Sequence, residues 1–350
     1  MFMPRRKIKV LIVDDSLLFR ETLARFLAEG EAVEVIGKAG NPYEARDMIL
    51  SLRPDVLTID VEMPKMNGIQ FLRKLIPQYP IPCVVVSSAA MMAFEAMDAG
   101  AVDYVKKPVA KTYEDLKTFA SELESKIVIA SQSKVIMRRR VPESAREHTD
   151  TSGMTCSPFN PVHSGKIVAL GASTGGTDAL QQVLAGFPED MPPVVIVQHM
   201  PPVFTKMFAE RLDKLSTIRV KEAENGDRLE EGLALLAPGD FQMAVEKDSR
   251  GYYVSVRAGE KVSGHCPSVD VLFYSVAHAA ESNAIGAIMT GMGGDGANGL
   301  VAMRAKGAYT IGQDKDSCVV YGMPMVAFKL GGCTEQLPLD EISDGILRHL

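Results

Sequence analysis

The chain has 350 residues, of which 46% are hydrophobic and 23% are charged, and its formal net charge is -6. This length is typical of two globular domains that each bury a core of their own. The acidic balance argues against a general binder of nucleic acids or anionic membranes, and since no stretch approaches the roughly 18 consecutive apolar residues of a membrane helix, we predict no direct membrane insertion.

The first part of the chain alternates β-rich runs with helix-like segments. The β-rich runs are residues 8–15, 32–40, 55–64, 82–88 and 103–108. Segments between them, such as 16–29 and 41–52, have apolar residues at every third or fourth position. This alternation predicts a doubly wound parallel sheet, in which ligands bind beyond the carboxyl ends of the strands.

Polar side chains occur at the ends of four of these predicted strands. They are Asp14, Asp15, Asp60, Ser87, Ser88 and Lys107. Three converging carboxylates repel one another unless a cation lies among them, and hard oxygen ligands suit Mg²⁺. We therefore predict a Mg²⁺ site at Asp14, Asp15 and Asp60, where the lysine and a hydroxyl can neutralise a phosphoryl group. Separate surface acids that cap helices would explain each residue singly but not their shared placement.

The motifs VDDS, IDVEMPKMNG, VVVSSA and DYVKKP follow one another in residues 5–126 and resemble a response-regulator receiver domain. The resemblance implies a flavodoxin-like fold and phosphorylation of Asp60 by a histidine-kinase phospho-donor. It also implies that Asp14 and Asp15 help to bind the metal and that Ser87 is the switch hydroxyl. Tyr104 is then the switch aromatic residue, and Lys107 is the lysine that contacts the phosphate. Such a domain is a switch and requires an output.

A polar segment rich in Ser, Thr and Pro covers residues 129–163 and is typical of a linker, with a start that is compatible with a helix. We therefore expect a receiver domain at residues 1–128 and a catalytic domain at 164–350. The three arginines 138–140 suit a contact with an acidic surface, although a solvated charge run is the simpler interpretation.

A second alternating series follows the linker. Its β-rich runs are residues 166–171, 192–200, 233–239, 283–291 and 307–313. They predict another α/β domain, a three-layer Rossmann-like parallel sheet covered by helices on both faces. Residues 241–256 resemble a hairpin, which we expect as an antiparallel excursion on the edge of this domain.

The stretch GASTGG places Ser173 between a predicted strand and a predicted helix. G-x-S-x-G in this context is typical of a nucleophilic serine on a tight turn. A glycine loop before a helix also binds phosphate through its backbone N–H groups, so the motif by itself leaves both interpretations open.

Two later strand ends favour the nucleophile. His199 ends the second run of this domain and can accept the serine proton, and Asp295 follows the fourth run and can orient the imidazole. A rival lies in GMGGDG, residues 291–296, which matches a dinucleotide-binding fingerprint with Asp314 further along. It is disfavoured because the Asp295 charge would repel a pyrophosphate and because the match falls late in the domain.

The motifs GASTGG, QHM, HCPSVDVLF, TGMGGDG and CVVYGMP resemble the catalytic domain of chemotaxis protein-glutamate methylesterases. The resemblance implies hydrolysis of glutamate γ-methyl esters on the cytoplasmic helices of chemoreceptors, and deamidation of receptor glutamines. It makes Ser173 the nucleophile, His199 the general base and acid, and Asp295 its orienting residue, with the backbone N–H of Met292 as an oxyanion donor.

The chain departs from the family pattern at two places. Cys266 stands where a basic residue is common, and Met325 with Val326 stands where Arg-Glu is common. Charged contacts at these places are therefore in doubt. No cofactor is expected for the esterase reaction, and the sequence leaves open whether the receiver inhibits or activates it.

Two other classes of protein remain as alternatives. One is a phosphorylation-dependent binding module whose second domain is catalytically inactive. The other is a receiver with a DNA-binding output, for which the second half offers no basic recognition helix.

The short apolar run after the N-terminal arginines ends at Asp14, which argues against an export signal. The five widely spaced cysteines favour reduced thiols, so we expect a cytoplasmic protein.

Overall fold

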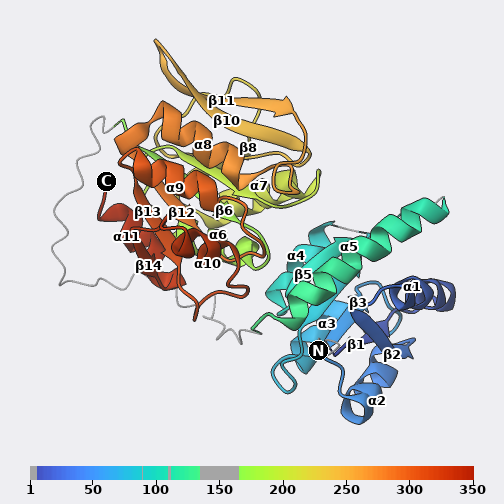
Figure 1. The fold of residues 1–350 in the computed structure, drawn as a ribbon. Helices are drawn as coiled ribbons and strands as arrows, with labels where there is room; N and C mark the ends of the chain where they lie inside the picture. Colours follow the sequence, from blue (N-terminus) through green and yellow to red (C-terminus); the bar gives the residue numbers. More distant parts are fainter. Residues whose placement is uncertain (1–5, 89, 109–111, 135–164) are drawn as a thin grey trace, which may run out of the picture.

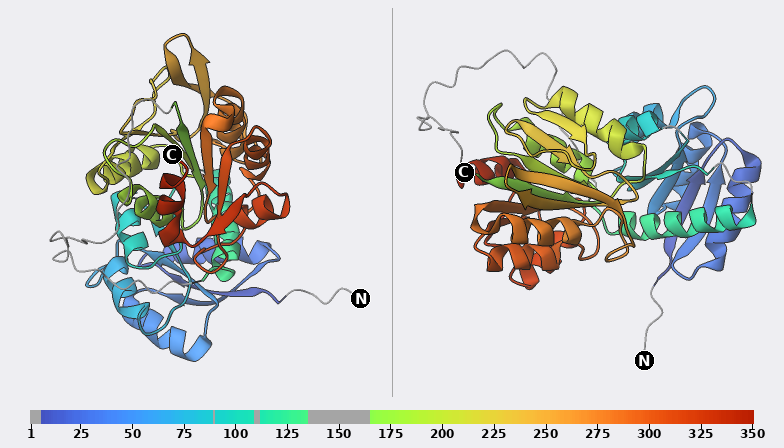
Figure 2. Two further views of the ribbon diagram at one scale, coloured as in Figure 1. Left: turned by 90° about the vertical axis from the view of Figure 1, so that its left-hand side faces the viewer. Right: turned by 90° about the horizontal axis from the view of Figure 1, so that it is seen from above.

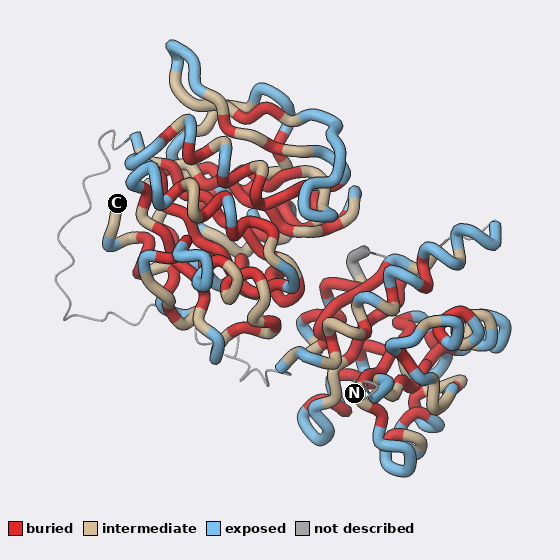
Figure 3. The backbone as a smooth tube through the Cα atoms, in the orientation of Figure 1, coloured by how far each residue is buried: buried red, intermediate tan, exposed pale blue. Residues whose placement is uncertain are grey.

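The computed structural model describes residues 6–88, 90–108, 112–134 and 165–350, which form two α/β domains (Figure 1). Two further views show the domains packed against each other, with helix α5 lying on the N-terminal domain and one of its ends reaching the C-terminal domain (Figure 2). Buried residues fill the interior of each domain, and exposed residues cover the outer helices and loops (Figure 3). Within the described residues, no helix is both long and apolar enough to span a bilayer.

The N-terminal domain contains a five-stranded parallel sheet of order β2-β1-β3-β4-β5. Its strands are β1 (Ile8–Val13), β2 (Val33–Ala39), β3 (Val56–Asp60), β4 (Cys83–Ser87) and β5 (Asp103–Lys106). Its helices are α1 (Leu17–Glu29), α2 (Pro42–Leu52), α3 (Gly68–Leu75), α4 (Ala90–Asp98) and α5 (Tyr113–Ser131). This strand order confirms the flavodoxin-like fold predicted for this part of the chain.

Successive side chains of each strand point alternately to the two faces of this sheet, and a different set of helices covers each face. Val10 and Ile12 pack with α1 and α5, whereas Leu11 and Val13 pack with α2, α3 and α4. Since successive side chains of a strand point to opposite faces, a strand buried on both faces has to be apolar throughout. The polar residues of the sheet are therefore concentrated at the strand ends.

The C-terminal domain contains a seven-stranded parallel sheet of order β14-β13-β12-β6-β7-β9-β8. The strands are β6 (Ile167–Ala172), β7 (Val194–Gln198), β8 (Arg219–Glu222), β9 (Leu233–Leu236), β12 (Ala284–Ile288), β13 (Tyr309–Gln313) and β14 (Glu335–Leu337). The helices are α6 (Gly176–Ala185), α7 (Phe204–Leu215), α8 (Val269–Ala279), α9 (Ala297–Ala305), α10 (Met323–Lys329) and α11 (Ile342–Leu347), with short 3₁₀ helices at Glu281–Asn283 and Leu339–Glu341.

Helices cover both faces of this second sheet, which confirms the predicted three-layer arrangement. Helices α6, α7 and α11 pack on the face that carries Val168 and Leu170. Helices α8, α9 and α10 pack on the face that carries Ile167 and Ala169. The short strands β8 and β14 were not predicted, because runs of four and three residues carry little periodic signal.

The predicted antiparallel hairpin forms, and it is separate from the seven-stranded sheet. Strands β10 (Phe241–Asp248) and β11 (Gly251–Ala258) pair antiparallel in a sheet of their own. Met243 and Val245 pack into the same core cluster as α8, and the N–H of Val245 donates to the Ser275 hydroxyl. The hairpin therefore covers a helix instead of extending a sheet edge (Figure 1).

Helix α5 is the last helix of the N-terminal domain in the described part of the chain. Thr112 and Asp115 form a capping box at its start, and the helix continues to Ser131, beyond the domain end expected at residue 128. Residues 135–163 of the predicted linker, including the arginine run 138–140, lie outside the described residues. Cys83, Cys266, Cys318 and Cys333 are free thiols in the described part of the chain.

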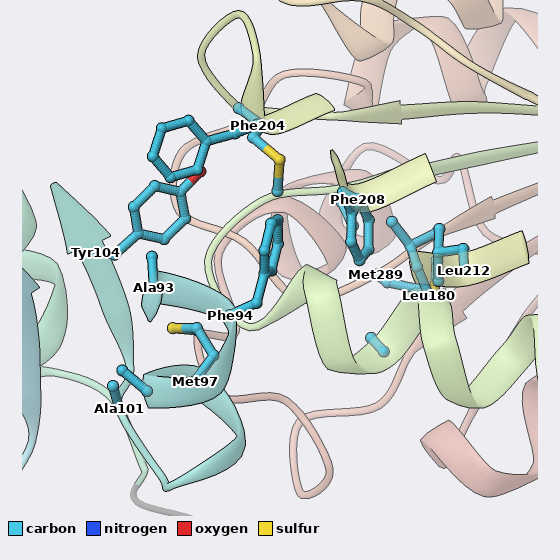
Figure 4. Close-up of a cluster of buried hydrophobic side chains, with 14 of the residues drawn as sticks. Ala93, Phe94, Met97, Ala101, Tyr104, Leu180, Phe204, Phe208, Leu212 and Met289 are labelled. Atoms are coloured by element: carbon cyan, nitrogen blue, oxygen red, sulfur yellow. The ribbon is translucent and has the colours of Figure 1, made fainter. Parts of the chain in front are cut away.

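Aromatic side chains from both domains form one continuous apolar cluster (Figure 4). Tyr104 of β5 stacks on Phe204 of α7, with ring centroids 4.7 Å apart and an interplanar angle of 10°. Phe94 of α4 stacks on Phe208 of α7 at 5.7 Å. At the rim of this contact Arg211 forms an ion pair with Asp98 at 2.8 Å. The two domains are thus joined by buried aromatic packing as well as by surface charges.

Candidate active site and phosphorylation site

The carboxylates of the N-terminal domain converge at the carboxyl ends of β1 and β3. Ligand oxygens of Asp14, Asp15 and Asp60 lie within 4.8 Å of one another. Asp14 and Asp60 are buried, and Asp15 is exposed. Three carboxylates around a partly open position form a donor set that suits a hard cation with some of its water retained, so these residues fit the predicted Mg²⁺ ion.

Lys107 completes this acidic pocket, as expected from its place after β5. Its ammonium group lies 2.7 Å from Asp14 Oδ2 and 2.5 Å from Asp60 Oδ2. Burial raises the pKa of Asp60 to about 6, while the hydrogen bond and charge of Lys107 act in the opposite direction. Ser87 is buried at the end of β4, the neighbouring strand.

Tyr104, the predicted switch aromatic residue, faces the C-terminal domain. Its ring lies against Phe204, and its hydroxyl is buried without a hydrogen-bond partner in the described part of the chain. Burial, followed by the nearby Asp103 and Glu122 carboxylates, raises the pKa of Tyr104 well above its ordinary value. The residue is therefore a neutral apolar contact between the domains.

Ser173 lies in a tight turn between β6 and α6. Its N–H donates to Thr290 O at 3.0 Å, and its carbonyl accepts from the Gly176 N–H at 2.7 Å. Gly175 has a φ of 79°, in the left-handed region that favours glycine. The backbone on both sides of Ser173 is thus held firmly, and the half-buried side chain lies at the carboxyl edge of the sheet.

His199 and Asp295 form the second part of the predicted triad. His199 Nε2 lies 2.7 Å from Asp295 Oδ2. Asp295 also accepts from Ser268 Oγ at 2.7 Å and from the N–H of Val269 at 2.7 Å. Burial acts to raise the pKa of Asp295, but the bonds from His199, Ser268 and Val269 outweigh it and the pKa is lowered. Asp295 is therefore an ionised carboxylate that orients the imidazole.

The bond to Asp295 leaves His199 Nδ1 as the ring nitrogen that can serve Ser173. Nδ1 is buried and has no hydrogen-bond partner among the described residues, so the serine hydroxyl is not engaged in this conformation. Ser173 and His199 nevertheless line the same cavity, whose volume is about 30 Å³. Long or absent contacts between nucleophile and base are common before substrate binds.

Met292 lies in the loop after β12, which approaches the nucleophile closely. A β-carbon at position 291 would lie 2.7 Å from Ser173 Cβ, so only glycine allows this approach. Met292 follows directly and is partly exposed. The loop Gly291–Gly296 also carries Asp295, which is engaged with His199 and the start of α8. The dinucleotide-binding alternative has no support from this geometry, because the acid that would repel phosphate is at the centre of the loop.

Sequence reasoning did not assign a role to His265, which lies against the catalytic histidine. The two rings stack with centroids 3.7 Å apart and an interplanar angle of 7°. Burial, and then the neighbouring His199, lower the pKa of His265 to about 4. His265 is the first residue of the motif HCPSVDVLF, which was the available signal, but spacing along the chain does not reveal a ring stack. Cys266 follows it, half-buried, and its thiol donates to Gly259 O at 3.8 Å.

The N-terminal domain covers the cavity that contains Ser173 and His199. From this domain the cavity is lined by Met97, Asp103, Tyr104, Lys106, Glu122 and Lys126. Asp103 Oδ2 accepts a hydrogen bond from Thr174 Oγ1 at 2.6 Å, directly beside the nucleophile. Lys126 of α5 donates to the same Asp103 oxygen at 2.9 Å. The site is closed by side chains of the other domain.

Comparisons with known proteins cover the chain in two parts. The family model described as response regulator receiver domain matches residues 10–118. The family model described as CheB methylesterase matches residues 168–346.

Two curated relatives match nearly the whole chain and are both called protein-glutamate methylesterase/protein-glutamine glutaminase. The one from Syntrophomonas wolfei is 50% identical over 98% of this chain and 98% of its own. The one from Syntrophotalea carbinolica is 47% identical over 98% and 97%.

A solved structure agrees with these sequence relatives. The catalytic domain of the CheB methylesterase of Thermotoga maritima is 37% identical and superposes with a TM-score of 0.52. It covers 53% of this chain and 99% of that domain. The resemblance stated from the sequence motifs is thereby confirmed at the level of family and fold.

Proposed function

Since the chain belongs to the CheB methylesterase family and carries a receiver domain before the methylesterase domain, we propose that it hydrolyses glutamate γ-methyl esters of chemoreceptors through Ser173, His199 and Asp295. Deamidation of receptor glutamines at the same site is part of the proposal. The observation that carries it is the 2.7 Å bond between His199 Nε2 and the buried Asp295, beside a serine held in a glycine turn.

The reaction proceeds in two acyl-transfer steps. Ser173 Oγ attacks the ester carbonyl and its proton passes to His199 Nδ1, while Asp295 stabilises the imidazolium that results. The Met292 N–H is the proposed donor to the oxyanion. The C–O bond to methanol then breaks and His199 returns the proton to the leaving oxygen. Water activated by His199 attacks the glutamyl ester of Ser173, which gives a carboxylate and restores the serine.

We propose that the unphosphorylated receiver inhibits the esterase by covering its active site. The supporting observation is that six receiver residues line a cavity of only about 30 Å³ around Ser173 and His199. A receptor helix is about 10 Å or more across, so it cannot reach Ser173 through this arrangement. An interface between domains of one chain is generally small enough to be displaced.

Phosphorylation of Asp60 by a histidine-kinase phospho-donor is the proposed trigger for release. Asp14, Asp15 and Asp60 would hold Mg²⁺, which supplies charge neutralisation for the incoming phosphoryl group. Ser87 and Lys107 contact the phosphoryl oxygens in this proposal, and Tyr104 moves with Ser87. Because Tyr104 stacks on Phe204, its movement removes apolar contacts that support closure.

The test is methanol release from a methylated receptor fragment by the full chain, with and without Mg²⁺ and a small phospho-donor such as acetyl phosphate. We expect release that increases on phosphorylation and stoichiometric labelling of Ser173 by a fluorophosphonate. If the chain were instead a binding module with an inactive second domain, phosphorylation would proceed while methanol release and Ser173 labelling stayed absent. That outcome would overturn the proposal.

A further inference from the structure

We propose that the hydroxyl of Thr174 binds the acyl group of the substrate, and that in the closed state the Asp103 carboxylate occupies the place of that group. The inference rests on the proposed esterase function and deepens it. It assigns Thr174 to substrate binding and describes the receiver as a product-like inhibitor of the site that it covers.

Thr174 is firmly held next to the nucleophile. Its carbonyl accepts from Thr290 Oγ1 at 2.9 Å, and only 4% of the residue is exposed. Its hydroxyl forms one side-chain hydrogen bond in the described part of the chain, and that bond crosses to Asp103 of the receiver. The protein acceptor for this hydroxyl at the active site is therefore supplied by the other domain.

Displacement of the receiver removes the Asp103 acceptor and exposes this hydroxyl to water. A ligand that displaces this water has to supply an acceptor at the same position, because otherwise the Thr174 hydroxyl would be buried again without a hydrogen bond. Thr177, which lines the same cavity, already has a buried hydroxyl with no partner among the described residues. The open site thus offers two hydroxyl donors among the residues that line the cavity of Ser173.

The chemistry of Asp103 indicates which acceptor fits. Its side-chain carboxylate reaches into a cavity that Ser173 and His199 also line, and it accepts from Thr174 at 2.6 Å. Hydrolysis of a glutamyl ester likewise produces a side-chain carboxylate beside the nucleophile. Both the ester and the amide of glutamate carry a carbonyl oxygen that can accept the same Thr174 bond.

The two partners of this hydrogen bond should therefore respond in opposite directions. If the bond only fastened the domains together, loss of either partner would raise the activity of the unphosphorylated chain. If Thr174 also binds substrate, Asp103→Ala raises basal activity, whereas Thr174→Val releases the receiver but weakens the open site. The ion pair of Arg211 with Asp98 provides the control, because it lies at the rim and both of its partners should respond alike.

The experiment measures methanol release by the full chain carrying Asp103→Ala, with and without Thr174→Val. We expect Thr174→Val to lower kcat/KM about tenfold in this background, which corresponds to about 1.4 kcal/mol. Thr174→Ser, which keeps the hydroxyl, should retain most of the activity. Equal rates with and without Thr174→Val, or a loss that Thr174→Ser does not rescue, would overturn the inference.

Two controls separate this inference from the proposed function. If the phosphorylated wild-type chain releases no methanol, the proposed esterase function fails. If it releases methanol and Thr174→Val does so equally well, only the role of Thr174 fails. Should Thr174→Val lower the melting temperature, Thr174→Ala carries the same expectation, since it also removes the hydroxyl.

Discussion

His199 Nε2 and Asp295 Oδ2 lie 2.7 Å apart, although 96 positions separate the two residues along the chain. The carboxylate is buried and accepts three further bonds at the start of α8, from the hydroxyl of the N-cap Ser268 and from the N–H groups of Val269 and Asp270. The imidazole is therefore fixed with Nδ1 toward the cavity. We expect Asp295→Asn to lower turnover by about 10⁴-fold, because an amide favours the wrong tautomer of His199. Methanol release by the phosphorylated chain measures this, and a loss below about tenfold would contradict the assigned orientation.

Removal of the nucleophile should have the largest effect of any single substitution in the site. We expect Ser173→Ala to reduce turnover by up to about 10⁶-fold, since the members of a triad act as a unit. The half-buried side chain is small, so the melting temperature should remain near that of the wild type. Methanol release at a near wild-type rate would refute the role of Ser173, and fluorophosphonate labelling offers an independent measurement.

The ion pair at the rim of the domain interface provides a mild test of closure. Arg211 and Asp98 are both partly exposed, with side-chain exposures of 26% and 38%, so their bond contributes no more than about 1 kcal/mol. We expect Asp98→Ala and Arg211→Ala each to raise basal methanol release by up to about fivefold. The charge-reversed pair Asp98→Arg with Arg211→Asp should restore inhibition. A decrease in basal activity would count against a receiver that inhibits.

Mg²⁺ removal should abolish phosphorylation without disturbing the esterase chemistry. Asp14, Asp15 and Asp60 supply the proposed ligands, and the triad residues lie in the other domain. We expect EDTA or Asp60→Asn to prevent phosphoryl transfer from a labelled donor, while fluorophosphonate still reacts with Ser173 in proportion to the fraction of open protein. Asp47→Asn, at an exposed position of α2, serves as the control. Undiminished labelling of the receiver in EDTA would exclude the metal site.

The His265 stack predicts a specific dependence of stability on pH. The pKa of His265 is about 4 in the folded chain against an ordinary value of 6.5, so the native state binds fewer protons than the unfolded state. Stability from this residue is therefore lost as the pH falls from about 6.5 towards 4. His199, Asp295, Lys126 and Lys261 are the charged or titratable groups around it.

We expect His265→Phe, which keeps a flat ring on His199, to lose less melting temperature between about pH 7 and about pH 5 than the wild type. The exposed His278 on α8 provides the control, because His278→Gln should leave the pH dependence unchanged. Thermal unfolding at the two pH values measures both. Identical losses in wild type and His265→Phe would contradict the assignment.

Much of this protein followed from local pattern in the sequence. Apolar runs that alternate with amphipathic segments predict parallel sheets, and in such sheets polar residues that end strands meet at one edge. Asp14, Asp60 and Lys107 were expected together for this reason. The same rule brought Ser173, His199 and Asp295 to one edge in the sequence analysis, and the structure places them around one cavity.

Contacts between the domains were decided only by the tertiary structure. Thr174 and Asp103 are 71 positions apart, and neither belongs to a motif whose spacing predicts their hydrogen bond. The stack of Tyr104 on Phe204 and that of His265 on His199 likewise depend on how separate elements pack. The spacing of apolar residues along the chain predicts which side chains are buried, but it does not predict which other surface they pack against. The reason is that the hydrophobic effect is not directional, so any apolar surface of suitable shape can cover them. The sequence by itself therefore determined the two folds and the residues at their strand ends, and the packing of one domain on the other decided what covers the active site.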